Sequence, residues 1–140
     1  MMDLRKLDDA ISVAPQLMPD ELTEVARLGF RTVINNRPDG ESFDQPPATT
    51  VAAAAAAAGL AYHYQPVNSG GLTIDDVLQF RELLATAEGP VLAFCRSGTR
   101  CANLWALAQA GNCNPDEVIA AAASAGYDVR GFRQILQNGL

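Results

Sequence analysis

The chain has 140 residues, of which 49% are apolar and 19% charged, and its formal net charge is −6. This size and composition suit one globular domain with its own core and exclude a disordered chain. The acidic balance also excludes a typical nucleic-acid-binding protein, which needs a basic face, so any anion site must be built locally.

Neither the amino terminus nor the apolar runs resemble a targeting or membrane segment. Residues 1–6 lack the apolar stretch of a secretory signal. The longest unbroken apolar run, residues 51–58, falls far short of the roughly 20 residues that span a bilayer. The three cysteines have no disulfide-framework spacing, so we expect a cytoplasmic protein with free thiols and no membrane association.

Strand-like and helix-like segments alternate along the chain. Their apolar patterns predict strands over residues 10–13, at the sheet edge, and over 31–35, 60–65 and 91–94. They predict helices over residues 19–28, 50–58, 74–84 or 74–87, 101–108, 115–125 and 129–136. Residues 36–47, rich in turn formers, are predicted to be a loop.

Three of these helices begin with capping signals. Thr49 or Thr50 is expected to cap the alanine-rich helix. Thr73 precedes Asp76 by the capping-box spacing. Asn114 precedes a proline, which favours the first helical position.

This alternation predicts βαβ units, and therefore a single three-layer α/β domain over residues 1–140 with a mainly parallel sheet between helices. Ligand sites in such sheets lie at the carboxyl ends of the strands. The loops that follow Asn35, Pro66 and Phe94 should therefore share one face.

The most informative segment begins where the apolar run 91–94 ends, at Cys95. Arg96, Gly98 and Arg100 follow within one tight loop before a helical pattern resumes. A strand, loop and helix in this order aim backbone N–H groups and the helix dipole at one point. Positive potential there favours the thiolate, so the segment predicts a nucleophilic cysteine in an anion-binding cradle, and hence an enzyme.

Residues 95–100 resemble the active-site loop of cysteine-dependent phosphatases and of rhodanese-like sulfurtransferases. Together with segments 35–41, 65–67 and 89–94, they make the chain similar to the bacterial phosphatase-like family of β-lactamase hydrolase-like proteins, also described as a sulfur-transferase family. The resemblance implies a tyrosine-phosphatase-like fold. We expect no cofactor and no metal, because the single histidine, His63, has no carboxylate or cysteine partner at metal-ligand spacing. The resemblance also implies a metallo-β-lactamase-fold, persulfide-oxidising partner, because such a domain occurs fused to family members.

The resemblance assigns roles to the loop. Cys95 would be the nucleophile and Arg100 the guanidinium that holds an anion. The remaining anion-binding positions would be Arg96, Ser97, Gly98, Thr99 and Cys101, with backbone N–H groups of 96–100 forming the cradle. Gly98 would allow close backbone approach.

The chain departs from the phosphatase pattern in four ways, and two of them, the short loop and the missing acid, favour sulfur chemistry. Four residues, rather than five, separate the cysteine from the arginine, and Phe94 replaces the usual histidine. Cys101 replaces the usual serine or threonine, and the loop after Pro66 offers Asn68 and Ser69 where a phosphatase needs an acid. We therefore expect sulfane-sulfur transfer through a Cys95 persulfide, with a small anionic or sulfur-donor substrate.

Two other functions stay open: phosphomonoester hydrolysis through a cysteinyl-phosphate, and a non-catalytic anion-binding or redox-sensing module. Cys101 is either a resolving thiol for Cys95 or a serine-like pocket residue. Asn68 and Ser69 are expected second-loop contacts. The loop after Asn35 contains Arg37, Asp39 and Glu41. We expect these residues to contact the substrate or supply an acid, and the alternative is that they form a solvated turn.

Overall fold

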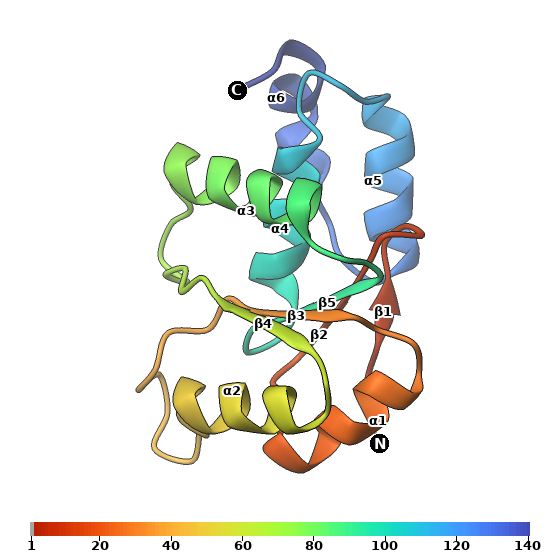
Figure 1. Ribbon diagram of the computed structural model, residues 1–140. Coiled ribbons are helices and arrows are strands. Elements are labelled where there is room, and N and C mark those ends of the chain that lie inside the picture. The colour runs from red at the N-terminus through yellow and green to blue at the C-terminus, as the bar shows by residue number, and fades with distance from the viewer. Residues whose placement is uncertain (1) are drawn as a thin grey trace.

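The computed structural model describes residues 2–140 and contains one five-stranded sheet between two layers of helices (Figure 1). The strands are β1 (Arg5–Lys6), β2 (Ile11–Ala14), β3 (Thr32–Asn35), β4 (Ala61–Tyr64) and β5 (Val91–Phe94). The α-helices are α1 (Leu22–Arg27), α2 (Ala48–Ala57), α3 (Ile74–Thr86), α4 (Thr99–Ala108), α5 (Pro115–Ser124) and α6 (Arg133–Asn138). Short 3₁₀ turns, η1 (Pro19–Glu21) and η2 (Arg130–Phe132), precede α1 and α6. The α/β fold class is confirmed.

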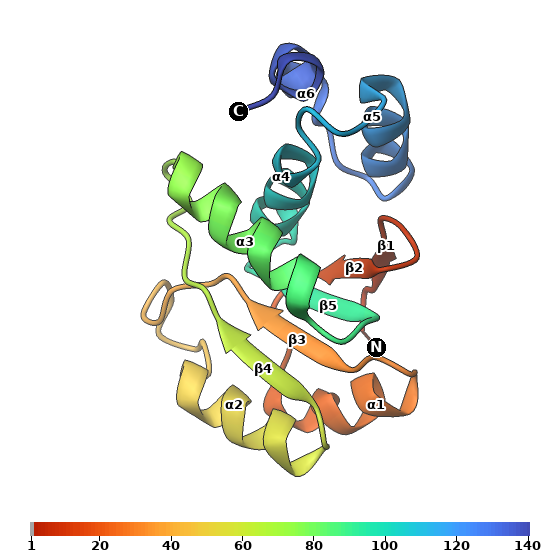
Figure 2. The same cartoon turned by 45° about the horizontal axis from the view of Figure 1, so that its top comes forward.

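The strands lie side by side in the order β1-β2-β5-β3-β4, as Figure 2 shows. All neighbours are parallel except β1, which pairs antiparallel with β2. The prediction that the strand near residue 10 forms an edge is therefore wrong. A two-residue strand at Arg5–Lys6 covers that edge, and two residues are too few to produce a sequence pattern.

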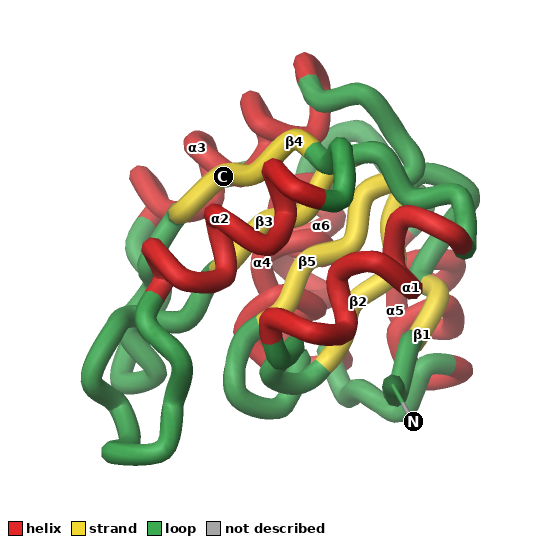
Figure 3. Tube along the Cα trace, turned by 60° about the horizontal axis from the view of Figure 1, so that its bottom comes forward, coloured by secondary structure: helices red, strands yellow, loops and turns green. Residues whose placement is uncertain are grey.

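Each face of the sheet is covered by its own helices. Val33 and Leu92 contribute to a core with α1 and α2, whereas Ile34 and Ala93 contribute to a core with α3 to α6. Figure 3 shows α1 and α2 together over one face. Among residues 2–140, no helix is long and apolar enough to cross a membrane.

The strand register brings the loops of interest together. Phe94 pairs with Ala14 on one side and Asn35 on the other, and Asn35 pairs with Tyr64. The parallel strands therefore end in line, and the segments that follow them emerge at the same edge. This edge includes the segment after Ala14, which the sequence did not suggest.

Local capping signals predicted the starts of two helices, α3 and α5, correctly. Thr73 Oγ1 accepts from the Asp76 amide at 3.1 Å, and the Asp76 carboxylate accepts from the Thr73 amide at 3.0 Å, so the capping box is confirmed. Asn114 caps α5 as predicted. The prediction that Thr49 or Thr50 caps the alanine-rich helix is wrong, because α2 begins at Ala48, before both threonines. A distant carboxylate, that of Asp39, accepts from the first amide of α2 instead.

Candidate active site

The cysteine loop turns sharply between β5 and α4. Gly98 has φ of +88°, a left-handed conformation that favours glycine. A Cβ atom at this position would lie 2.2 Å from the hydroxyl oxygen of Tyr127, which itself donates a hydrogen bond to the Ser97 carbonyl at 3.2 Å. Tyr127 therefore supports the loop from behind, and only glycine fits between them.

The loop surrounds the sulfur of Cys95 with hydrogen-bond donors. The Gly98 amide donates to Cys95 Sγ at 3.1 Å. The pKa of Cys95 is lowered from 9.0 to about 5, and the Cys101 thiol is the largest cause. Burial acts in the opposite direction and raises this pKa. The backbone amides of Cys101 and Ser97 and the positive charge of Arg100 lower it further. Cys95 is therefore a thiolate at neutral pH, as a nucleophile requires.

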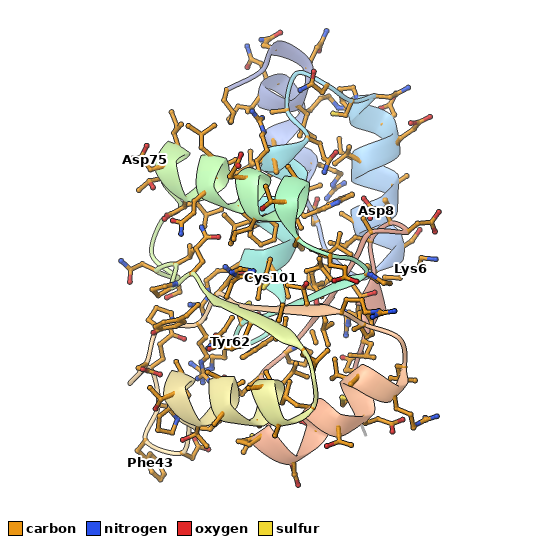
Figure 4. All side chains as sticks on the ribbon, viewed as in Figure 1. Lys6, Asp8, Phe43, Tyr62, Asp75 and Cys101 are labelled. Atoms are coloured by element: carbon orange, nitrogen blue, oxygen red, sulfur yellow. The ribbon has the colours of Figure 1, made fainter. Side chains whose placement is uncertain are left out.

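Cys101 lies on the first turn of α4 with its sulfur 3.2 Å from Asn36 Oδ1 (Figure 4). Asn36 is fixed in turn, since its amide nitrogen donates to the Gln65 carbonyl at 2.9 Å. Burial, and then the neighbouring Cys95, raise the pKa of Cys101 well above 9.0. Its single S–H hydrogen donates to Asn36 Oδ1, and the neighbouring Cys95 thiolate is a second, charged acceptor that competes for it.

Arg100 is held from two other loops. Its Nη1 donates to Glu41 Oε2 at 2.7 Å and to the Val67 carbonyl at 2.9 Å, and its Nη2 donates to Glu41 Oε1 at 2.9 Å. These bonds use three of its five N–H groups. Within residues 2–140, the Nε hydrogen and the second Nη2 hydrogen have no partner. These two N–H groups lie on the same side of the planar guanidinium. In this geometry they can donate to two oxygens of one oxyanion.

Glu41 lies between two arginines, because Arg37 Nε also donates to its Oε1, at 3.0 Å. The remaining groups of Arg37 donate to Gln16 at 2.9 Å and to Ser42 at 3.3 Å. The hydrogen bonds from Arg100 are the main cause that lowers the pKa of Glu41, against the effect of burial. A carboxylate stabilised in this way is a poor proton donor, so Glu41 is suited to positioning Arg100 and not to acid catalysis.

The other predicted residues fall into separate groups. Asp39 does not enter the site, since its carboxylate caps α2. Arg96 is exposed beside Arg37, at the rim of a hollow on the β2 side of the loop. Two exposed hydroxyls, those of Ser97 and Thr99, bond each other at 3.0 Å.

Asn68 and Ser69 are brought to the opposite side of the cysteine loop, where they line a groove together with Arg100. Within the described part of the chain, no three His, Cys, Asp or Glu side chains lie close enough to hold a metal ion. The groups that surround the sulfur are therefore hydrogen-bond donors and one guanidinium. They suit an anion.

Cys95 has 0% of its surface exposed. A substrate atom can therefore reach the sulfur only when the loop or a covering side chain moves. Its chemistry is set by the surrounding donors, whereas its access depends on motion of the loop or of a covering side chain.

Sequence reasoning missed two residues that hold the loop. Asn36 positions Cys101, and its place directly after a predicted buried strand was a usable signal. Tyr127 supports Gly98 from a segment 29 residues further along, for which no local pattern existed.

The family profile described as "Beta-lactamase hydrolase-like protein, phosphatase-like domain" matches residues 3–112. A beta-lactamase hydrolase-like protein of Xylella fastidiosa is 39% identical over 130 residues, which make up 91% of this chain and 30% of that protein. One from Agrobacterium fabrum is 35% identical over 105 residues, 75% of this chain and 24% of that protein. The chain thus spans less than a third of the length of these curated relatives.

Solved structures agree with the family match. A candidate phosphatase from Neisseria meningitidis has 39% identity and a TM-score of 0.85, with 98% of each chain covered. The core catalytic domain of a PP-IP phosphatase from S. cerevisiae has a TM-score of 0.69 at 13% identity, covering 96% of this chain and 83% of that one, and shows the fold alone. The chain has a tyrosine-phosphatase-like fold and belongs to the phosphatase-like family of beta-lactamase hydrolase-like proteins.

Proposed function

We propose that this chain transfers sulfane sulfur through a persulfide formed on Cys95. The thiolate attacks the outer sulfur of a donor such as thiosulfate, an S–S bond forms to Cys95, and sulfite leaves with the electron pair of the broken bond. Cyanide or an acceptor thiolate then takes the sulfur and restores the Cys95 thiolate. The lowered pKa of Cys95 supports both steps, because the thiolate is nucleophile and leaving group in turn.

The observation that carries the proposal is the engagement of the nearby carboxylates. Hydrolysis of an alkyl phosphate needs an acid to protonate the departing oxygen. Asp39 caps α2, Glu41 is held between two arginines, and Asp76 belongs to the cap of α3. Asp75 lies at the outer end of α3, well away from Cys101 in Figure 4. Sulfite leaves as a stable anion and needs no such acid.

Phosphomonoester hydrolysis is the second candidate, and the free side of the Arg100 fork favours it. The Nε and Nη2 hydrogens can hold two oxygens of a phosphoryl group as well as those of a sulfonyl group. The fold shared with phosphatases supports the same reading. A cysteinyl-phosphate would then replace the persulfide.

One set of assays separates the candidates. The purified chain is given thiosulfate and cyanide, thiocyanate is measured, and Cys95→Ser and Cys113→Ser serve as the test and control variants. We expect turnover that is lost only in Cys95→Ser, together with a mass gain of one sulfur atom on Cys95 before cyanide is added. Hydrolysis of an aryl phosphate without sulfur uptake would instead establish the phosphatase.

Two further expectations accompany the proposal. A chain that turns over neither substrate but forms a Cys95–Cys101 disulfide with peroxide would be a redox-sensing module. If sulfur transfer holds, we expect the persulfide to be consumed by a metallo-β-lactamase-fold, persulfide-oxidising partner. Addition of such an enzyme should then raise the steady-state rate of donor consumption in a Cys95-dependent way.

A further inference from the structure

A groove of about 430 Å³ opens beside the cysteine loop, between α3, α4 and α6. Figure 2 shows these three helices on the same side of the sheet. Seven of its lining residues have apolar side chains: Leu72, Ile74, Val77, Leu107, Phe132, Ile135 and Leu140. The volume lies within the range of small-molecule sites and exceeds what an inorganic donor such as thiosulfate fills.

One lining side chain of this groove is charged. Among its lining side chains, all within the described chain, Arg100 alone carries a charge, and the polar neighbours Asn68, Ser69 and Asn103 are neutral. The Arg100 side chain is only 10% exposed. Because Arg100 lines the groove, its unused Nε and Nη2 hydrogens are available to an anionic group bound there.

Apolar side chains are left in water around the groove. Ile74 is 62% exposed and Ile135 is 42% exposed, although both line it. A ligand that covers them removes apolar surface from water, which favours binding by about threefold to fourfold for each methylene buried. An apolar ligand with an anionic head matches both this surface and the single guanidinium.

We propose that the groove binds the hydrocarbon or aryl body of an organic sulfane-sulfur donor whose anionic head lies on Arg100. The substrate class is an amphiphilic monoanion, and the assignment rests on the proposed function. With an organic thiosulfonate, the Cys95 thiolate forms a bond to the terminal sulfur, and the S–S bond to the sulfonyl group breaks. The leaving sulfinate keeps the electron pair, and Cys95 carries the persulfide. A donor whose body is itself charged finds no counter-charge along the walls.

The test compares methane-, butane- and hexanethiosulfonate with cyanide as acceptor. In the wild type, kcat/KM rises about threefold for each added methylene until the groove is filled. Ile135→Gln and, independently, Ile74→Gln reduce the ratio of hexane- to methanethiosulfonate kcat/KM. The matched control is Leu78→Gln, because Leu78 is 44% exposed on α3 and does not line the groove; it keeps the ratio.

Binding of the unreactive alkanesulfonates, measured by calorimetry, separates this inference from the proposed function. Tighter binding of hexane- than methanesulfonate, weakened in Ile135→Gln, supports the groove even if no donor is turned over. If neither kcat/KM nor binding affinity changes with the length of the alkyl chain, the proposal for the groove is overturned. The proposed function then still stands if thiosulfate is turned over. Sedimentation could instead show a dimer that dissociates in Ile135→Gln but not in Leu78→Gln. This result would assign the groove to contact with a second copy of the chain and would also overturn the proposal.

Discussion

Replacing Cys101 with alanine tests the electrostatics of the site most directly. The Cys101 thiol is the largest cause that holds the pKa of Cys95 at about 5. Cys101→Ala removes this donor and leaves the backbone amides and Arg100 in place. Cys101→Ser is the matched variant, because its hydroxyl can donate to the same sulfur. The two variants differ by one hydrogen-bonding group.

The expected shift follows from the strength of one charge-assisted hydrogen bond. Such a bond contributes about 1.5–3 kcal/mol, which corresponds to about 1–2 pKa units. The pKa of Cys95 should therefore rise to about 6–7 in Cys101→Ala. Near neutral pH the thiolate still forms half or more of the population, so its reactivity changes little. Around pH 5 the thiolate population falls about fivefold to fiftyfold.

The assay is a pH titration of the ultraviolet absorbance of the thiolate, repeated as the rate of Cys95 alkylation. Burial raises the pKa of both other cysteines, so only Cys95 titrates in the acidic range. Cys113→Ala should leave the curve unchanged, and Cys101→Ser should stay within about one unit of the wild type. An unshifted curve in Cys101→Ala would refute the assignment of Cys101 as the main donor.

Glu41→Gln should lower kcat/KM for any anionic substrate by about tenfold to a hundredfold, because the loss of charge-assisted bonds leaves Arg100 poorly oriented. Steady-state kinetics measures this change, and the thiolate absorbance of Cys95 should stay the same. Asp39→Ala should destabilise the chain by about 1 kcal/mol in urea unfolding without altering the pKa of Cys95, because it removes the acceptor for the first amide of α2. Gly98→Ala should abolish activity, and Tyr127→Phe added to it should not restore activity, because the positive φ remains; recovery in the double variant would contradict this. Raising the pH from about 5 towards 9 should stabilise the wild type relative to Cys95→Ser by up to about 1.4 kcal/mol per unit in urea unfolding, because the folded thiol is already ionised there and the unfolded thiol is not.

The parts of the structure that depend on neighbouring residues were predictable from sequence. Thr73 with Asp76, and Asn114 before a proline, cap helices through contacts within a few residues, so their patterns are visible in the chain. The strand that ends at Phe94 was equally clear, because a short apolar run before a glycine-containing loop has few alternatives. The nucleophile and its cradle followed from that local order, and their catalytic role stays a prediction.

Contacts between distant segments could not be predicted in the same way. Asp39 caps a helix nine residues away, and Glu41 reaches Arg100 across 59 residues of sequence. Their shared loop at the strand end predicts for both a substrate contact, an acid or a solvated turn. Which partner each carboxylate takes depends on the packing of three loops, and no periodicity encodes that packing. The same holds for Tyr127 behind Gly98.

The charges at the site bear on the charge of the substrate that it can accept. Arg37 and Arg100 are balanced by Glu41 and by the Cys95 thiolate, so the four groups cancel before any ligand binds. A monoanionic donor adds one negative charge, and transfer of its sulfur leaves Cys95 as a persulfide anion with the charge of the thiolate it replaces. A phosphate dianion adds two negative charges, and no acid in the site is protonated to offset them. Exposed Arg96 is a further cation of the cysteine loop, but its side chain lies in water, where charge pairing is weak. We therefore expect the site to accept a monoanionic donor, such as an organic thiosulfonate, more readily than a dianion, whether thiosulfate or a phosphomonoester.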